Sequence, residues 1–146
     1  MTFLGMTLDR KLTFCHHFNK LIAKCESKIN LLRVAKGTQF GCSKNSMIIL
    51  YKALIQSQLD YGAQVYASVS KTQLARLDHV QGKALRIVLG ALPGTSQQSL
   101  LREAGVKPLH LRREELTLKY AMRVKARGRK CIEGVVAMRR GEVHVH

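Results

Sequence analysis

The stretch HHFNKLIAKCESKINLLRVA, residues 16–35, predicts the fold most directly. Its apolar residues recur at steps of three and four, which places them on one face of an α-helix. They are Phe18, Leu21, Ile22, Cys25, Ile29 and Leu32. The other side of this helix carries a basic residue every four positions, a stripe formed by His16, Lys20, Lys24 and Lys28. We therefore expect a helix that packs through one face and presents positive charge on the other.

The basic stripe has two interpretations. Like charges four residues apart repel each other, so the stripe is either a solvated surface or a row that lies along a phosphate backbone, where binding releases counterions. The chain of 146 residues holds 25 Lys and Arg against 9 Asp and Glu, a formal charge of +16, while 46% of it is hydrophobic. This composition is typical of a folded protein with a polyanionic partner, most often nucleic acid.

Capping residues mark where further helices begin and end. The expected starts are Ser43 or Asn45, Ser70 or Thr72, Thr95 or Ser96, and Pro108, and the expected breaks or kinks are Asp60-Tyr61-Gly62, Gly90 and Gly105. Each of these segments carries apolar residues at helical spacing. The sequence therefore predicts a mainly α protein with about five helices in a bundle.

Residues 2–14 have the alternating pattern of a β-hairpin. Leu4, Met6 and Leu8 form the first apolar row, Asp9-Arg10-Lys11 supplies a polar turn, and Leu12 and Phe14 resume the alternation. We therefore divide the chain into an N-terminal hairpin at residues 1–14, a helical region at residues 15–126, and a basic, disordered tail at residues 127–146.

The C-terminal part of the chain has the densest positive charge. The segment RVKARGRK, residues 123–130, holds five basic residues in eight. A solubilising tail, a phosphate contact and a nuclear import signal all fit this segment.

The nine carboxylates are scattered, which argues against a self-contained carboxylate or two-metal active site. Four cysteines form no CxxC pair, and we expect them to be reduced thiols of an intracellular protein, cytoplasmic or nuclear. A zinc site at Cys15, His16, His17 and Cys25 is disfavoured because adjacent histidines point about 100° apart on a helix. We therefore predict no catalytic residue, metal, cofactor or small-molecule ligand. We also predict no contact with a membrane, because no apolar run is long enough to span one.

Several stretches together resemble one family. They are FLGMTLD (3–9) with LTF (12–14) and His17, INLLRVAKGTQFG (29–41), LYKALIQSQLDYGAQVYASVSKTQLARLDHVQGKALRIVLGA (50–91) and SLLREAGVKPLHLRREELTLKYAMRVK (99–125). They resemble the reverse transcriptases of non-LTR retrotransposons, and the jockey-type elements most closely. The resemblance covers residues 3–125 and corresponds to the end of the palm, the thumb and the helical connection that follows.

The resemblance also implies what this chain lacks. The polymerase chemistry of the family depends on a Tyr/Phe-Ala-Asp-Asp motif and a further palm Asp, whereas this sequence contains no Asp-Asp pair. The chain therefore resembles a non-catalytic thumb fragment with a palm-edge hairpin, whose partners are template–primer RNA–DNA duplex or RNA and the palm of a longer polyprotein.

The resemblance implies a nucleic-acid-binding set as well. Its members are His16, Lys20, Lys24, Lys28, Leu4 and Gly5. An RNA–DNA hybrid is A-like, so contacts to its backbone and shape are expected. Leu4 and Gly5 are equally explained as ordinary strand residues.

Other polar residues have structural explanations. Asp60-Tyr61-Gly62 fits a helix junction with a packed Tyr and a tight turn at Gly. We expect Arg86 to pair with Asp60 or Asp78, and the run Arg112 to Glu115 to form local salt bridges. Two further interpretations of the whole chain remain open: a degenerate relic without selected function, and a basic helical module that binds an acidic protein.

Overall fold

The computed structural model describes residues 2–3, 6–7, 10, 14–37, 41–63, 66 and 69–139. Its elements are the strands β1 (Thr2–Phe3) and β2 (Met6–Thr7), and the helices α1 (Cys15–Gly37), α2 (Lys44–Tyr51), η1 (Lys52–Gln56), α3 (Ser57–Asp60), α4 (Lys71–Leu89), α5 (Gln97–Ala104) and α6 (Leu109–Arg139). Because α2, the π-helical turn η1 and α3 follow one another without a break, these helices form five segments. The predicted fold class, mainly α with a short N-terminal hairpin, is confirmed.

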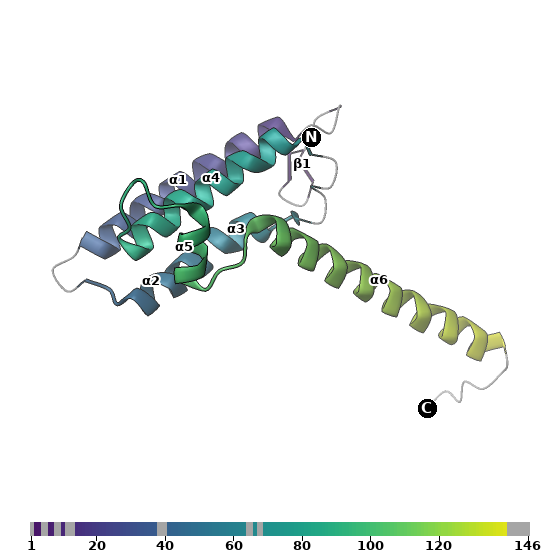
Figure 1. The fold of residues 1–146 in the computed structure, drawn as a ribbon. Coiled ribbons are helices and arrows are strands. Elements are labelled where there is room, and N and C mark those ends of the chain that lie inside the picture. Colours follow the sequence, from purple (N-terminus) through teal and green to yellow (C-terminus); the bar gives the residue numbers. More distant parts are fainter. Residues whose placement is uncertain are drawn as a thin grey trace.

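The helices α1 and α4 lie side by side and run in the same direction (Figure 1). Side-chain contacts between them advance together along both helices. Gln73 meets Cys15 at 3.3 Å, Arg76 meets Asn19 at 2.9 Å, and Lys83 meets Glu26 at 2.6 Å. The continuous segment from α2 to α3 connects them, so it must return in the opposite direction.

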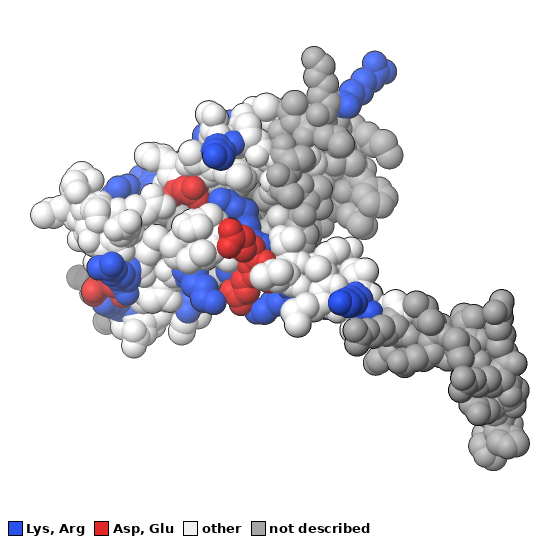
Figure 2. All heavy atoms as spheres, turned by 45° about the vertical axis from the view of Figure 1, so that its right-hand side comes forward, with Lys and Arg blue, Asp and Glu red and all other residues white. Residues whose placement is uncertain are grey.

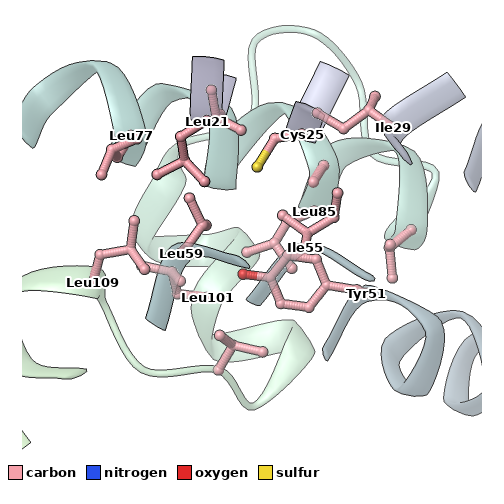
Figure 3. Packing of buried hydrophobic residues seen from close by; sticks show 14 of the residues in the cluster. Leu21, Cys25, Ile29, Tyr51, Ile55, Leu59, Leu77, Leu85, Leu101 and Leu109 are labelled. Atoms are coloured by element: carbon pink, nitrogen blue, oxygen red, sulfur yellow. The ribbon is translucent and has the colours of Figure 1, made fainter. Parts of the chain in front are cut away.

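The core lies between these three helical segments, and Figure 3 shows its side chains pointing toward one another. The predicted apolar face of α1 is confirmed, with five of its members buried and Ile22 half-buried. From the other helices the core takes Met47, Tyr51, Ile55, Leu59, Leu77, Val80, Ala84, Leu85, Val88, Leu100, Leu101, Ala104 and Leu109. Because the spacing decides which side chains point inward, the packed face was readable from the sequence.

The π-helical turn η1 has a simple geometric consequence. Met47, Tyr51, Ile55 and Leu59 are spaced by four residues, and in a straight α-helix each such step would rotate the side chain by about 40°. A π-helical turn holds more residues per turn and reduces that drift. All four side chains are therefore buried against the same core.

Several helix ends follow the predicted caps. Ser43 and Ser96 each accept a backbone N–H three residues later, both at 3.2 Å. Gly90 and Gly105 end α4 and α5 in the left-handed conformation, with φ of 68° and 61°. These two positions favour glycine because a side chain there would be strained.

The hairpin is present, but its turn is not where the sequence predicted it. Thr2 pairs with Thr7 and Phe3 with Met6, so residues 4–5 connect the strands and not Asp9-Arg10-Lys11. Phe14 belongs to no strand: its φ is 56° and its ring is buried, edge-on to the ring of Tyr66 at 6.3 Å. Alternation cannot distinguish a second strand from an irregular segment that buries one aromatic. Leu8 and Leu12 lie outside the described residues.

We call residues 14–116 the body, and it includes the first turns of helix α6. Beyond these turns α6 projects away from the body (Figure 1). From Thr117 to Gly128, a segment that we call the arm, every side chain is exposed. The helix continues to Arg139, so residues 127–139 are helical and do not form the disordered tail predicted for 127–146. Seven of these thirteen residues are Arg, Lys, Ala, Met or Glu, which favour helix, whereas Gly128 and Gly134 do not. The domain boundaries at 14 and 126 stay predictions.

Candidate nucleic-acid interface

The predicted basic stripe lies along α1. His16, Lys20 and Lys24 are exposed, and Lys28 is half-buried. Within the described part of the chain, no carboxylate forms an ion pair with any of the four. The stripe therefore presents positive charge that the fold itself does not neutralise, which is what a phosphate backbone requires.

Lys28 lies nearer to the core than Lys20 and Lys24 do, since it is half-buried and they are exposed. A step of four residues advances about 40° around an α-helix, so the stripe winds gradually from the solvent side of α1 toward its packed flank. This drift explains why Lys28 is half-buried although it repeats the spacing of the others. Leu4 and Gly5, the two remaining members of the predicted binding set, lie outside the described residues.

A pocket of about 240 Å³ opens beside the stripe. It is lined by Thr7, His17, Lys20, Leu21, Lys24, Gln58 and Tyr61, so it joins β2, α1, α3 and the residue that follows α3. Two stripe lysines thus line a cavity as well as an exposed helix face. The sequence analysis did not connect these segments, because Thr7, Lys20 and Gln58 are far apart along the chain.

His17 is the residue that the sequence analysis missed. It is buried, its Nδ1 accepts the backbone N–H of Thr7 at 3.4 Å, and its Nε2 lies 3.1 Å from the hydroxyl of Tyr66. Since that hydroxyl donates to the carbonyl of Tyr61 at 2.9 Å, Nε2 carries the proton and the imidazole is neutral. Burial, followed by the charges of Lys24 and Lys20, lowers the pKa of His17 below its usual value. Its position four residues before Leu21 was the available signal, because it puts His17 at the edge of the apolar face.

Asp60 and Asp78 hold α6 against the body. Two nitrogens of Arg112 donate to Oδ2 of Asp60 at 3.1 and 3.0 Å, and Arg113 lies 3.7 Å from Asp78. The predicted local pair also forms, since Arg112 lies 3.6 Å from Glu115. The hydrogen bond with Asp60 raises the pKa of Arg112. These groups have structural partners and are not available for nucleic acid.

Two structural expectations were wrong. Arg86 pairs with neither aspartate, because both are occupied by α6, and instead donates to the carbonyl of Thr95 at 3.4 Å. Tyr61 is 53% exposed and not buried as a core residue, and its backbone is extended where α3 ends. Gly62 does provide the expected turn, with φ of 76°.

A second group of cations lies near the C-terminal ends of α1 and α4, around a pocket of about 540 Å³. All four have partners within the fold. Lys36 donates to the carbonyl of Ile87 at 2.6 Å, Lys83 pairs with Glu26, Arg86 donates to the carbonyl of Thr95, and Arg33 donates to Oδ1 of Asn30 at 3.2 Å. Lys36 and Arg86 also offset the negative ends of their helix dipoles. These cations therefore stabilise the fold, whereas the stripe on α1 forms no ion pair with the described residues.

Figure 2 shows Lys and Arg side chains spread over one face of the body, around a small group of acidic side chains. On the arm, Lys119 pairs with Glu115 at 2.6 Å, while Arg123, Lys125 and Arg127 are exposed. The hydrogen bonds from Lys119 and Lys107 lower the pKa of Glu115 to about 2. Positive charge therefore extends from the body onto the arm.

Across the described residues, no three His, Cys, Asp or Glu side chains come close enough together to hold a metal ion. Cys25 is buried, which raises the pKa of its thiol to about 11, while Cys15 is exposed. Cysteines 15, 25 and 42 are free thiols. In the same described parts, no helix is both long and apolar enough to cross a bilayer.

The chain is related to the RNA-directed DNA polymerases of jockey-type non-LTR retrotransposons. It is 30% identical over 126 residues to the RNA-directed DNA polymerase from mobile element jockey of Drosophila melanogaster, a match that covers 84% of this chain. The jockey polymerase of Drosophila funebris is 30% identical over 61% of the chain. The probable RNA-directed DNA polymerase from transposon X-element of Drosophila melanogaster is 24% identical over 60% of it.

The chain spans a small part of these relatives: 13% of the first and 10% of each of the other two. No family model matches the chain, and no solved structure matches it.

Proposed function

We propose that this chain is a non-catalytic part of a retrotransposon RNA-directed DNA polymerase, and that it binds template–primer nucleic acid through the stripe of His16, Lys20, Lys24 and Lys28. The observation that carries the proposal is the stripe itself, whose charges have no carboxylate partner among the described residues. The relation to jockey polymerases supports a nucleic-acid partner, and the absence of an Asp-Asp pair from the sequence supports a role without metal-dependent chemistry.

The mechanism follows from electrostatics. Each lysine that contacts a phosphate releases a condensed counterion, so the free energy of binding is dominated by salt-dependent ion release. Mutual repulsion between the lysines is relieved when phosphates lie between them. The spacing along one helix suits a backbone contact better than base readout, because an RNA–DNA hybrid presents a wide, shallow minor groove with little sequence information.

A salt titration tests this proposal. Fluorescence anisotropy would measure the affinity of the full chain for a blunt RNA–DNA hybrid between low and moderate salt. We expect the log–log slope of the wild type to be steep, and the triple variant Lys20→Gln, Lys24→Gln, Lys28→Gln to reduce it by up to about 2 to 3.

The matched control removes the same charge elsewhere. The variant Lys52→Gln, Lys71→Gln, Lys125→Gln alters three exposed lysines outside the stripe that form no ion pair with the described residues. The proposal is supported if the stripe variant loses more slope than the control. Equal losses would show a diffuse charge effect, and an unchanged slope in the stripe variant would exclude the stripe.

A second function has one observation in its favour. The arm exposes Leu118, Met122 and Val124, at 64%, 71% and 50%, within strongly basic surroundings. An acidic amphipathic segment of another protein could cover these side chains. Replacing all three by Gln would abolish such binding and leave hybrid binding intact, which separates this function from the first.

A further inference from the structure

The pocket beside the stripe combines charged, apolar, polar and aromatic lining residues. It has cations at Lys20 and Lys24, an apolar wall at Leu21, and polar groups at Gln58 and Thr7. The larger cavity near Lys36 has cations but no aromatic residue among its lining, and most of its cations are already engaged. The cavity between α4 and α6 is lined by Arg113, which faces Asp78.

Tyr61 stands at this pocket with an exposed ring. Its side chain is 53% exposed, while its backbone carbonyl is held by the hydroxyl of Tyr66 at 2.9 Å. The residue is thus anchored through its backbone and offers an aromatic surface to the pocket. A nucleobase stacks on such a surface whatever its identity, because every base has a π-face.

His17 is fixed by two hydrogen bonds, to the N–H of Thr7 and to the hydroxyl of Tyr66. Gln58 makes no side-chain hydrogen bond to the residues that the structure describes, so its amide can both donate to and accept from a bound group. The arrangement provides one hydrogen-bonding side chain, one stacking ring and two phosphate partners.

We propose that this pocket binds a single unpaired nucleotide, with its base beside Tyr61 and Leu21, its polar edge at Gln58, and its phosphate at Lys20 and Lys24. The inference rests on the proposed function, since the strand leaves the pocket along the same stripe. A volume of about 240 Å³ suits one base and excludes a stacked duplex. Duplex therefore lies on the exposed lysines, while an unpaired residue at its end turns inward.

The experiment compares three ligands with the full chain at one salt concentration. They are a blunt RNA–DNA hybrid, the same hybrid with a one-nucleotide overhang, and the overhang with an abasic residue. We expect the ligand with the overhang to bind at least about 5-fold more tightly than either of the other two. This factor corresponds to the lower end of the free energy for stacking one base on an aromatic side chain. An overhang that binds no better than the abasic ligand overturns the proposal.

Two tyrosine variants provide the matched comparison. Tyr61→Ala should reduce the ratio of overhang to blunt affinity to about 1, and Gln58→Ala should reduce it partly. Tyr120→Ala removes a ring of the same 53% exposure on α6 and should keep the ratio. Tyr61→Phe should keep it as well, because stacking needs the ring and not the hydroxyl. Equal losses in Tyr61→Ala and Tyr120→Ala overturn the proposal.

The outcomes separate the pocket from the stripe. If blunt hybrid binds through the stripe and the overhang adds nothing, the pocket proposal fails and the proposed function stands. If no hybrid binds, both fail. Competition by a free nucleoside monophosphate distinguishes a free nucleotide from one at a strand end. If a low concentration of the monophosphate made the overhang ligand bind no better than the blunt hybrid, the pocket would select free nucleotides. That result would overturn the assignment to a strand end.

Discussion

The body and the arm are both helical, but they are stabilised differently. In the body, α1, the segment from α2 to α3, and α4 each bury one apolar face in a common core. In the arm, from Thr117 to Gly128, all side chains are exposed, and only local hydrogen bonds and helix propensity act. Isolated helices of this length are marginal in water. The comparison teaches that residues with similar helix propensity contribute to global stability only where tertiary packing couples them to the core.

The largest expected effect is a core truncation. Leu85→Ala removes a fully buried side chain of α4 and should lower the free energy of unfolding by about 2–5 kcal/mol. Leu118→Ala truncates the same residue type on the arm, where Leu118 is 64% exposed. It should change the free energy of unfolding by less than about 0.5 kcal/mol. Urea denaturation measures both. Equal losses would show that the arm packs on something in solution.

The contact that holds the start of α6 within the body gives the next effect. Asp60→Asn weakens the ion pair between Asp60 and Arg112, whose side chains are 19% and 27% exposed, respectively. It should lower the free energy of unfolding by about 1–2 kcal/mol. Lys119→Gln breaks an exposed pair with Glu115 and should leave the urea midpoint nearly unchanged. If Asp60→Asn is neutral, α6 is not held to the body by this contact.

Substitutions at two glycines, one in the body and one in the arm, have a smaller expected effect on stability. A Cβ at Gly82 in α4 would meet Gln97 at 3.6 Å, an ordinary contact, and a Cβ at Gly128 would meet nothing within 4 Å. Gly82→Ala should therefore raise the free energy of unfolding by about 0.5–1 kcal/mol. Gly128→Ala should raise the helical circular dichroism signal without shifting the denaturation midpoint. A shifted midpoint would mean that the arm unfolds together with the body.

The smallest expected effect is a dependence of the free energy of unfolding on pH, which arises from His17 in the body. The pKa of His17 is lowered by burial and by Lys24 and Lys20, so the unfolded chain takes up a proton at higher pH than the folded chain does. The stability contributed by neutral His17 is therefore complete above pH 6.5 and is lost as the pH falls below it. Protonation would also place an N–H of His17 against the N–H of Thr7.

Denaturation curves between pH 5 and 8 would measure this slope. His17→Gln should flatten it, while His16→Gln, at the exposed neighbouring position, serves as the control. The carboxylate Glu115, with its pKa lowered to about 2, contributes in a separate and more acidic window. A slope that survives His17→Gln would assign the effect to another group.

Patterns that repeat along one helix were read correctly from the sequence. The face of α1 formed by Phe18, Leu21, Cys25, Ile29 and Leu32 follows from spacing alone, and Ser96 and Gly90 mark helix ends through their own chemistry. The hairpin turn was misplaced because alternation does not set strand register, which depends on pairing. The helical stretch at 127–139 was not predicted, because its two glycines and two valines disfavour helix.

The parts of the site that the sequence did not reveal all join distant segments. His17 and Tyr66 are 49 residues apart, and Asp60 and Arg112 are 52 apart. No local pattern links such residues, because their contact depends on how the helices pack. For the same reason the pocket joining Thr7, Lys24 and Gln58 was not foreseen.

By itself, the sequence determined the helical class, the buried face of α1, the basic stripe on its other side and the relation to jockey-type polymerases. Each of these depends on residue types at local spacing or on their order along the chain. Only the tertiary structure decided which charges keep no partner, where Tyr61 stands, and that α6 leaves the core. These depend on distances between segments, which packing sets and the local pattern does not.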